Sequence, residues 1–289
     1  MKNLLIGGTG FIGTALAKEL VRRGETVTVI SSDRGGEESG VTYVTATLGP
    51  DDCPDDLLKQ AEKVFILIGQ TGPNFDAETE KKTLQRLTKT LQTGQQKVFY
   101  FSSVHVYGES SKPATETSAI RPIGTYSTFK RDAETLLGEA IPAERLVIFR
   151  LTNVYGSSKN RGFIGLLMNR LAQADSTPIT LNSNGRSKRD YILIDDVVGA
   201  VLTVANDKKS SGIVNVATGQ SYSLLEVLER LEQVSGRLIP HVLSTVKPGE
   251  PELVFISNHQ LQKVYHYHHF TTLEDGLKIT LKRYQKEAS

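Results

Sequence analysis

Short apolar runs separated by longer amphipathic segments dominate the first half of the chain. The run over residues 64–68 is continuous rather than alternating, which is typical of a strand covered on both faces of a parallel sheet. Residues 76–93 are polar and carry leucines at helical spacing. Strands that alternate with helices indicate an α/β fold built on a doubly wound parallel sheet with right-handed crossovers. The expected strands are residues 1–6, 27–30, 41–44, 64–68, 98–101 and 146–149, and the expected helices are residues 14–21, 76–93 and 126–137.

The second half of the chain is less regular, and its elements are predicted from shorter patterns. Ser223 is placed to cap a helix that follows it directly. Neither an internal repeat nor a low-complexity linker divides the chain, so the two parts are expected to share segments. The expected elements are helices over residues 161–174, 224–234 and 272–286, a strand end running into a helix over 189–205, and a strand over 214–216.

A glycine-rich turn joins the first expected strand to the first expected helix. Gly7, Gly10 and Gly13 follow the opening apolar run directly, with the spacing GxxGxxG. Glycines let a backbone turn tightly, approach phosphate groups and pack a helix against a strand, while the amides at the helix start face an anion. The turn therefore predicts the pyrophosphate site of a dinucleotide, with Phe11 and Ile12 beside it; a purely structural turn is the alternative.

A tyrosine and a lysine four residues apart carry the chemical prediction. Tyr126 and Lys130 share one face of an expected helix, downstream of a strand that ends in Ser102 and Ser103. A free tyrosine, with a pKa of about 10, is a poor base at neutral pH, but a nearby ammonium and a cationic nicotinamide ring favour the phenolate. Such a tyrosine passes a proton to or from a sugar hydroxyl while hydride moves to or from the nicotinamide. The alternative is a surface aromatic–lysine pair.

Six segments of the chain match one enzyme family in order and spacing. They are GGTGFIG (7–13), FSSVHVYG (101–108), PATETSAIRPIGTYSTFKRDAE (113–134), FRLTNVYG (149–156), GRSKRDYILIDDVVGAV (185–201) and VNVATGQSYSLLEVL (214–228). With them the chain resembles the extended short-chain dehydrogenase/reductases, and specifically their sugar-nucleotide epimerase/dehydratase branch. The RDYILIDDVV segment is the most diagnostic, because it is similar to a motif of enzymes that act on nucleotide-diphosphate sugars.

The resemblance implies a Rossmann-type sheet and a smaller C-terminal substrate-binding region. The expected division is a dinucleotide-binding domain over residues 1–155, to which segments of about 189–218 return, and a mostly substrate-binding region over 156–289. The residues expected to contact the dinucleotide are Gly7, Gly10, Phe11, Ile12, Gly13, Ser31, Ser32, Asp33, Arg34, Gly69, Tyr126 and Lys130.

The resemblance also implies three catalytic residues. Ser103 aligns with the residue that hydrogen-bonds the reacting sugar hydroxyl, and Tyr126 aligns with the catalytic base. Lys130 aligns with the residue that holds the nicotinamide ribose and lowers the tyrosine pKa.

Further residues are implied to bind the substrate. Asn153 and Arg189 match positions that contact the substrate diphosphate, and Lys247 is expected to supply a second phosphate cation. The alternatives are that Asn153 only caps a turn and that Arg189 pairs with Asp190 or Asp196. Residues for which a structural role is expected are Asp195, Asp196 and Asn215.

The end of the second expected strand leaves the cofactor undecided. Members that prefer NAD usually carry an acidic residue there for the adenosine ribose, whereas this chain has Ser31, Ser32, Asp33 and Arg34. Asp33 suits the ribose of NAD, but Ser32 and Arg34 suit the 2′-phosphate of NADP equally well. The acidic residue often found near the adenine is replaced around residues 46–48. Both NAD and NADP therefore remain open.

The residues after Ser103 argue against a dehydratase. The 4,6-dehydratases of the family place an Asp-Glu pair there, and this chain has Val104 and His105. The acid and base needed to eliminate water are therefore missing. His105 is expected to be a hydrogen-bonded residue of the substrate pocket, with proton transfer as the alternative.

Composition narrows the class of protein further. The net charge is +2 and the basic runs are short, so neither nucleic acid nor an anionic membrane is an expected partner. Apolar stretches fall short of the ~20 residues of a membrane span, and no signal or transit peptide is expected before the first strand. Cys53 is the only cysteine and is expected to be inert, which suits the reducing cytoplasm. No metal site is expected.

The leading hypothesis is an NAD(P)-dependent sugar-nucleotide epimerase that works by transient oxidation of a sugar hydroxyl through a 4-keto intermediate. The rival is an NADPH-dependent reductase of an NDP-4-keto sugar, which would use nearly the same residues. A decarboxylating member has no distinctive support in the sequence, and the intact Ser103, Tyr126 and Lys130 argue against a non-catalytic NAD(P)-binding sensor. A homodimer is expected through residues 76–93 and 125–138, because members of the branch often pair in this way.

Overall fold

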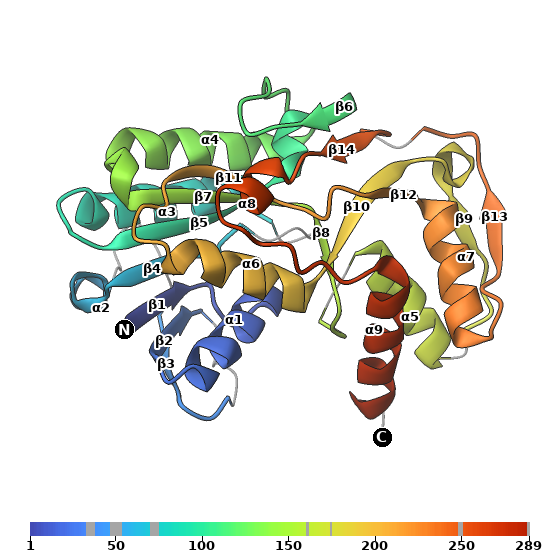
Figure 1. Ribbon diagram of the computed structural model, residues 1–289, viewed down its shortest axis with the longest axis horizontal. Coiled ribbons are helices and arrows are strands. Elements are labelled where there is room, and N and C mark those ends of the chain that lie inside the picture. Colours follow the sequence, from blue (N-terminus) through green and yellow to red (C-terminus); the bar gives the residue numbers. More distant parts are fainter. Residues whose placement is uncertain are drawn as a thin grey trace. The chain divides into compact units, whose positions relative to one another are not determined.

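The computed structural model describes residues 1–32, 38–46, 54–69, 75–159, 162–173, 175–247 and 251–287 (Figure 1). Two compact units form, and each draws on several segments of the chain. Unit 1 consists of Met1–Val106, Gly124–Arg150 and Val201–Val214, and unit 2 consists of Tyr107–Ile123, Leu151–Ala200 and Asn215–Ser289. The sequence prediction assigns residues 107–123 to the first domain, whereas the structure groups them with unit 2. The functional division of the chain stays a prediction.

A seven-stranded sheet forms the centre of unit 1. In spatial order it consists of β11 (Gly212–Val216), β7 (Leu146–Leu151), β5 (Lys97–Ser103), β4 (Lys63–Ile66), β1 (Lys2–Ile6), β2 (Thr26–Ser31) and β3 (Val41–Thr45). The pairs β1–β2, β1–β4, β2–β3 and β4–β5 are parallel. All positions of β4 are buried, as expected for a strand covered on both faces. The expected α/β doubly wound fold is confirmed, and its strand order reverses between β1 and β4, where such folds bind ligands.

Amphipathic helices accompany this sheet (Figure 1). Leu84, Leu87 and Leu91 recur every three to four residues on one helix and are buried. They share an apolar cluster with Phe129 and Leu137 of the neighbouring helix. The helical segments are α1 (Phe11–Arg22), α2 (Asp55–Gln60), α3 (Ala77–Leu91), α4 (Thr125–Ala140), α6 (Ile194–Asn206, which runs from unit 2 into unit 1) and the 3-10 turns η1 (Val104–Tyr107) and η2 (Ala143–Arg145).

Unit 2 combines short strands with three longer helices. Ser223 caps α7 as predicted: its Oγ accepts from the Glu226 amide at 3.1 Å, and the Glu226 carboxylate accepts from the Ser223 amide at 2.7 Å. The elements are β6 (Ser110–Ala114), β8 (Asn153–Tyr155), α5 (Phe163–Gln173), β9 (Ile179–Leu181), η3 (Asn182–Gly185), β10 (Lys188–Leu193), β12 (Ser221–Ser223), α7 (Leu224–Ser235), β13 (His241–Leu243), β14 (Val254–Ile256), α8 (His259–Lys263) and α9 (Leu273–Glu287).

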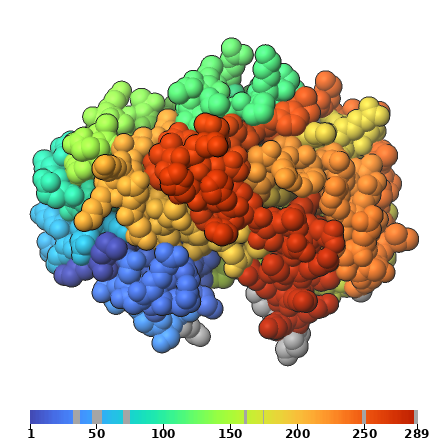
Figure 2. All heavy atoms as spheres, viewed as in Figure 1, coloured from blue at the N-terminus to red at the C-terminus, as the bar shows by residue number. Residues whose placement is uncertain are grey.

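The strands of unit 2 form small sheets, and its long helices share a core. The sheets are ordered β12-β10-β8, β13-β9 and β14-β6. Leu167 of α5, Leu228 of α7 and Leu277 of α9 belong to one apolar cluster. The outward side chains of α9 are visible in red in Figure 2. Across the ranges given above, no helix is long and apolar enough to cross a membrane.

Every helix and strand expected from the sequence is present, with shifted ends; the strand expected over 64–68, for example, ends at Ile66. The sequence pattern does not predict α2, α8 or the strands β6, β8, β9, β12, β13 and β14. Most of these strands have three residues, which is too short for an alternating pattern to stand out. Their pairing depends on partners distant in the sequence, such as β14 with β6.

Candidate active site

The glycine turn lies between β1 and α1, at the carboxyl end of β1. Gly7 has a φ of +74°, and a Cβ there would lie 3.1 Å from Ile68 Cγ2. A Cβ at Gly13 would lie 2.4 Å from the carbonyl oxygen of Gly8, and one at Gly8 would lie 2.9 Å from Leu5 Cβ. The fold itself therefore favours glycine at positions 7, 8 and 13. Gly8 was not predicted, because it falls outside the GxxGxxG spacing.

The start of α1 is suited to an anion. Gly10 precedes the helix, no side chain caps it by a hydrogen bond, and this helix has no acidic residue in its first turn. The first amides of the helix therefore lack intrahelical partners and carry partial positive charge. A Cβ at Gly10 would meet nothing closer than the Gly7 carbonyl oxygen at 3.9 Å. The residues here fit a dinucleotide, with the half-buried Phe11 and Ile12 beside the turn.

Two glycine substitutions are expected to affect different properties, one the stability of the fold and the other the affinity for NAD. Gly13→Ala is expected to lower the free energy of unfolding by about 1–3 kcal/mol, because its methyl group meets the Gly8 carbonyl. Gly10→Ala is expected to change stability by less than about 0.5 kcal/mol. It should nevertheless weaken NAD binding by about tenfold or more, because the methyl group lies where phosphates approach the helix. Urea unfolding and calorimetric titration with NAD measure both; wild-type NAD affinity in Gly10→Ala would contradict this placement of the pyrophosphate.

The end of β2 is tied to the glycine turn. The Ser31 hydroxyl is buried and lies 2.8 Å from the Thr9 hydroxyl, whereas Ser32 is exposed. Asp33 and Arg34 lie outside the described residues. Their predicted contacts, and with them the choice between NAD and NADP, therefore stay predictions.

Ser103 and Tyr126 lie near each other in unit 1, close enough for the serine hydroxyl to lower the pKa of the phenol. Ser103 ends β5 and is buried, and Tyr126 lies in the first turn of α4. The Ser103 Oγ also accepts from the His105 amide at 3.2 Å. Burial raises the pKa of Tyr126 to about 12, and the Ser103 hydroxyl opposes this rise. The sequence prediction of a favoured phenolate also invokes a cationic nicotinamide ring, so the lowered pKa stays a prediction for the protein with its cofactor.

Lys130 lies one helical turn after Tyr126 and is buried. Its Nζ donates to the carbonyl oxygens of Phe101 and Ile68 at 2.7 and 2.9 Å, and lies 5.8 Å from the centroid of the Tyr126 ring. Burial lowers the pKa of Lys130 to about 7, against the carboxylates of Glu80 and Glu134, which raise it. Ser103, Tyr126 and Lys130 are thus brought together as the motifs predict.

Gly69 makes room for this lysine. Its φ is +87°, and a Cβ there would lie 2.9 Å from Lys130 Nζ and 2.6 Å from Phe129 Cε1. The preceding Ile68 supplies the carbonyl that Lys130 contacts and also packs against Gly7. The glycine turn, the end of β4 and the lysine are therefore contiguous within unit 1.

His105 follows Ser103 by two residues, in the 3-10 turn η1. It is half-buried, and its backbone amide is the donor to Ser103. This contact fixes the turn to the predicted catalytic serine. Whether the ring lines the substrate pocket or carries a proton stays a prediction.

The predicted diphosphate ligands lie in unit 2. Asn153 begins β8, and its Nδ2 donates to the carbonyl oxygen of Asp190 at 3.0 Å. Arg189 is buried on β10, and its Nη1 donates to the carbonyl oxygens of Lys188 and Glu252 at 2.9 and 3.0 Å. Lys247 is exposed. The roles of these residues toward a substrate stay predictions.

Asp190 and Asp196 have structural partners of their own. The Asp190 carboxylate is fully buried and accepts from the amides of Gly219 and Thr218 at 2.7 and 3.1 Å. Burial raises its pKa to about 7, although these hydrogen bonds oppose the rise. The Asp196 carboxylate accepts from the Thr271 amide at 2.7 Å. Both acids therefore fix loops of unit 2.

Asp195 and Asn215 also join distant segments. Asp195 forms an ion pair with Arg283 of α9 at 2.9 Å. Asn215 is fully buried; its Oδ1 accepts from the Tyr107 hydroxyl at 2.7 Å, and its Nδ2 donates to the carbonyl oxygens of Ala114 and Ser257. These contacts agree with the structural roles expected for both residues.

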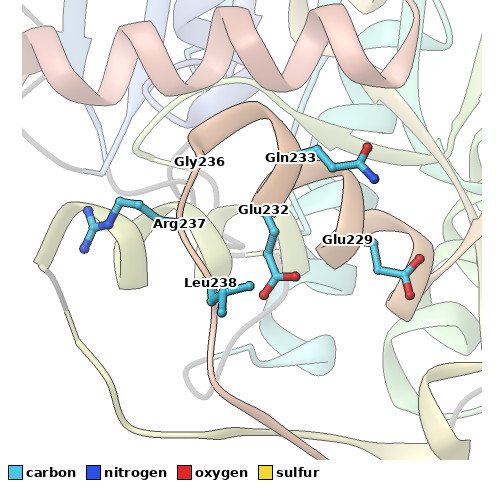
Figure 3. A pocket seen from close by; sticks show the side chains of 6 residues that line it. All are labelled: Glu229, Glu232, Gln233, Gly236, Arg237 and Leu238. Carbon is cyan, nitrogen blue, oxygen red and sulfur yellow. The ribbon is translucent and has the colours of Figure 1, made fainter.

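A surface pocket near the end of α7 is unrelated to the predicted site residues. Figure 3 shows Glu229, Glu232 and Gln233 projecting from the helix and Arg237 directed away from Glu232. The guanidinium of Arg237 donates to the Leu171 carbonyl oxygen at 2.8 Å. The lining contains neither a predicted catalytic residue nor a predicted phosphate ligand.

Known proteins share this sequence and fold. The model of the NAD dependent epimerase/dehydratase family matches residues 3–217. A UDP-N-acetyl-alpha-D-glucosaminuronate decarboxylase of Bacillus cytotoxicus is 24% identical, over 98% of this chain and 97% of its own. A UDP-glucose 4-epimerase of Lactobacillus helveticus is 28% identical, over 87% of each chain. The crystal structure of UDP-glucuronic acid 4-epimerase from Bacillus cereus, in complex with UDP-glucuronic acid and NAD, has a TM-score of 0.89 at 22% identity and covers 99% of this chain and 100% of its own.

Proposed function

The chain belongs to the NAD dependent epimerase/dehydratase family, and from this membership we propose that it is an NAD(P)-dependent epimerase of a sugar nucleotide. The family resemblance expected from the motifs is thereby confirmed, and with it the class of extended short-chain dehydrogenase/reductase enzymes. The observation that carries the proposal is the buried Lys130, held by two backbone carbonyls with its Nζ 5.8 Å from the Tyr126 ring centroid, beside Ser103 at the end of β5. These groups lie in the unit that also contains the glycine turn.

The proposed mechanism moves a proton through Tyr126. NAD, when bound, would supply the hydride acceptor and donor for the transient oxidation of the sugar hydroxyl. Ser103 hydrogen-bonds the reacting hydroxyl, and the Tyr126 phenolate accepts its proton and later gives it back. Because burial holds the pKa of Tyr126 at about 12, the phenolate depends on positive charge close to the ring. The Lys130 ammonium, 5.8 Å from the ring centroid, is the group of this chain that supplies it.

The proposed substrate is a UDP-sugar. The decarboxylase and the two epimerases compared above carry UDP-sugars in their names. Arg189, with its forked guanidinium, Asn153 and Lys247 are the proposed ligands of the diphosphate. Water elimination is not proposed, because Val104 and His105 stand where the dehydratases have their acidic pair.

A homodimer through α3 and α4 completes the proposal. The two helices pack beside each other in unit 1, and a second copy of the pair would form a four-helix bundle. Light scattering of the purified protein is expected to give twice the mass of the 31.7 kDa chain. A monomer at micromolar concentration would contradict this assembly.

Extraction of the freshly purified protein under denaturing conditions tests the function. Near-stoichiometric NAD by mass spectrometry is the expected result, because an epimerase reuses one cofactor through the whole cycle. Conversion of UDP-glucose or UDP-glucuronic acid without added cofactor should follow. Protein without cofactor that binds NADPH better than NADH would instead favour the 4-keto reductase. Retained cofactor without turnover of any UDP-, dTDP-, GDP- or CDP-sugar would favour a sensor.

A further inference from the structure

Three polar side chains of α4 follow one another at intervals of one helical turn. Tyr126, Lys130 and Glu134 are each four residues apart, so they share one face of the helix. Lys130 and Glu134 are both buried on this face. The mechanism proposed above uses Tyr126 and Lys130, and it leaves Glu134, the third member of the row, without a role.

Lys130 and Glu134 hold consecutive residues of β5. The Lys130 Nζ donates to the carbonyl oxygen of Phe101 at 2.7 Å. The Glu134 carboxylate accepts from the hydroxyl of Ser102, which is the next residue of the strand. Ser103 follows directly and ends β5. The strand is therefore joined to α4 at the two residues that precede the predicted catalytic serine.

The Glu134 carboxylate is itself held by β7, the neighbour of β5 in the sheet. The Nε of Arg150 donates to Glu134 Oε1 at 3.0 Å, and its Nη2 lies 2.5 Å from Oε2. Such forked pairing fixes the orientation of a carboxylate as well as its position. Oε1 also accepts from Ser102. The serine hydroxyl therefore binds an acceptor that is both buried and fixed.

We propose that Ser102 is a positioning residue of the reaction. Its hydrogen bond to Glu134 holds the end of β5 against α4, and thereby sets the position of Ser103 relative to Tyr126. This role rests on the function proposed above for Ser103 and Tyr126. Ser102 acts only through the end of the strand, so it is not a catalytic residue. The ion pair of Glu134 with Arg150 does not need the serine hydroxyl, so loss of the hydroxyl should affect the site more than the fold.

Ser102→Ala tests the proposal, because it removes the hydroxyl and leaves the ion pair beside it in place. The value of kcat for a UDP-sugar is expected to fall by about 10- to 100-fold, since a reacting group misplaced by about 1 Å can cost about 100-fold in rate. KM is expected to stay within about twofold. The proposed ligands of the diphosphate, Asn153 and Arg189, belong to unit 2 and are not altered.

Two further variants are the controls for these rates. Ser102→Thr keeps the hydroxyl at a strand position, where a β-branched residue is favoured, and should retain most of the wild-type kcat. Ser210→Ala removes another buried hydroxyl of unit 1, one that has no hydrogen-bond partner among the described residues. This variant should leave kcat unchanged. Circular dichroism establishes that each variant is folded before the rates are compared.

The NMR signal of Lys130 tests the same contact without a substrate. The protein is enriched with 13C at the ε carbon of lysine, and the signal is identified by its absence from Lys130→Met. Because burial lowers the pKa of Lys130 to about 7, the signal is recorded in mildly acidic solution, where the ammonium forms. In Ser102→Ala it is expected to move by more than its line width, since the ammonium donates to Phe101 at the released strand end. The displacement should be smaller in Ser102→Thr and absent in Ser210→Ala.

These measurements separate the role of Ser102 from the proposed function. A wild-type kcat in Ser102→Ala, a Ser102→Thr enzyme as slow as Ser102→Ala, or an unmoved Lys130 signal in Ser102→Ala would overturn the proposal. An unfolded Ser102→Ala protein would also overturn it, because the hydroxyl would then serve the fold alone. A wild-type protein inactive on every sugar nucleotide would instead contradict the proposed function, and the NMR comparison would still decide whether Ser102 holds the strand end in place.

Discussion

Tyr126→Phe is expected to reduce kcat for a UDP-sugar by about 10²–10⁴-fold, the usual contribution of a general base. The substitution keeps the ring that packs against Phe75, with centroids 5.9 Å apart, and removes only the phenol hydroxyl. NAD affinity should therefore change little, because the glycine turn and Lys130 are left in place. Initial rates and calorimetric titration with NAD measure the two effects separately.

Tyr43→Phe is the matched control for this substitution. Tyr43 lies on β3 of the same unit and is half-buried, and it belongs to no predicted site. Removal of the Tyr43 hydroxyl should leave kcat unchanged. A fully active Tyr126→Phe enzyme would overturn the proposed mechanism, since no proton transfer would then pass through this residue.

Arg150→Met is expected to lower the free energy of unfolding by about 3–5 kcal/mol, the cost of leaving one charge of a buried pair without its partner. Arg150 is 1% exposed, and its Nε donates to Glu134 Oε1 at 3.0 Å. The carboxylate also accepts from the Ser102 hydroxyl, but it would lose its only described ion pair. Urea unfolding followed by circular dichroism measures the loss, because the chain has no tryptophan for fluorescence.

The neighbouring pair of Arg131 and Asp132 provides the control. The distance between Arg131 Nη2 and Asp132 Oδ1 is 2.6 Å, similar to the 2.5 Å between Arg150 Nη2 and Glu134 Oε2, but these two side chains are 43% and 42% exposed. Arg131→Met should therefore cost only about 0–1 kcal/mol. The double substitution Arg150→Met with Glu134→Leu should recover much of the stability, since an apolar pair replaces the buried charges. A loss in Arg150→Met no larger than in Arg131→Met would show that the buried pair does not stabilise the fold.

The sheet of unit 1 was predictable because its signals are local. The continuous apolar run over 64–68 and the spacing of the leucines over 84–91 predict buried positions from the sequence alone. The small sheets of unit 2 were not predictable in this way. β8, for example, has three residues and is defined by its parallel pairing with β10, about 40 residues further along the chain. Only the fold brings such segments together.

The candidate site was predicted in its residue types but not in its contacts. The motifs indicate Ser103, Tyr126 and Lys130, and these residues do come together. The acceptors of Lys130 are backbone carbonyls, which carry no side-chain signal in a sequence. The burial that raises the pKa of Tyr126 was not predictable either, since a motif shows the neighbouring lysine but not how deeply the phenol is buried.

The most direct test of the account follows a deuterium label through turnover. A UDP-hexose that carries deuterium at C4 is incubated with the purified protein, without added cofactor, and its products are followed by NMR. The account predicts a mixture of the two C4 epimers, both with deuterium still at C4, because the same hydride equivalent leaves and returns. Loss of deuterium to the solvent would contradict the account. So would a protein that leaves the UDP-hexose unchanged but reduces an NDP-4-keto sugar when NADPH is added.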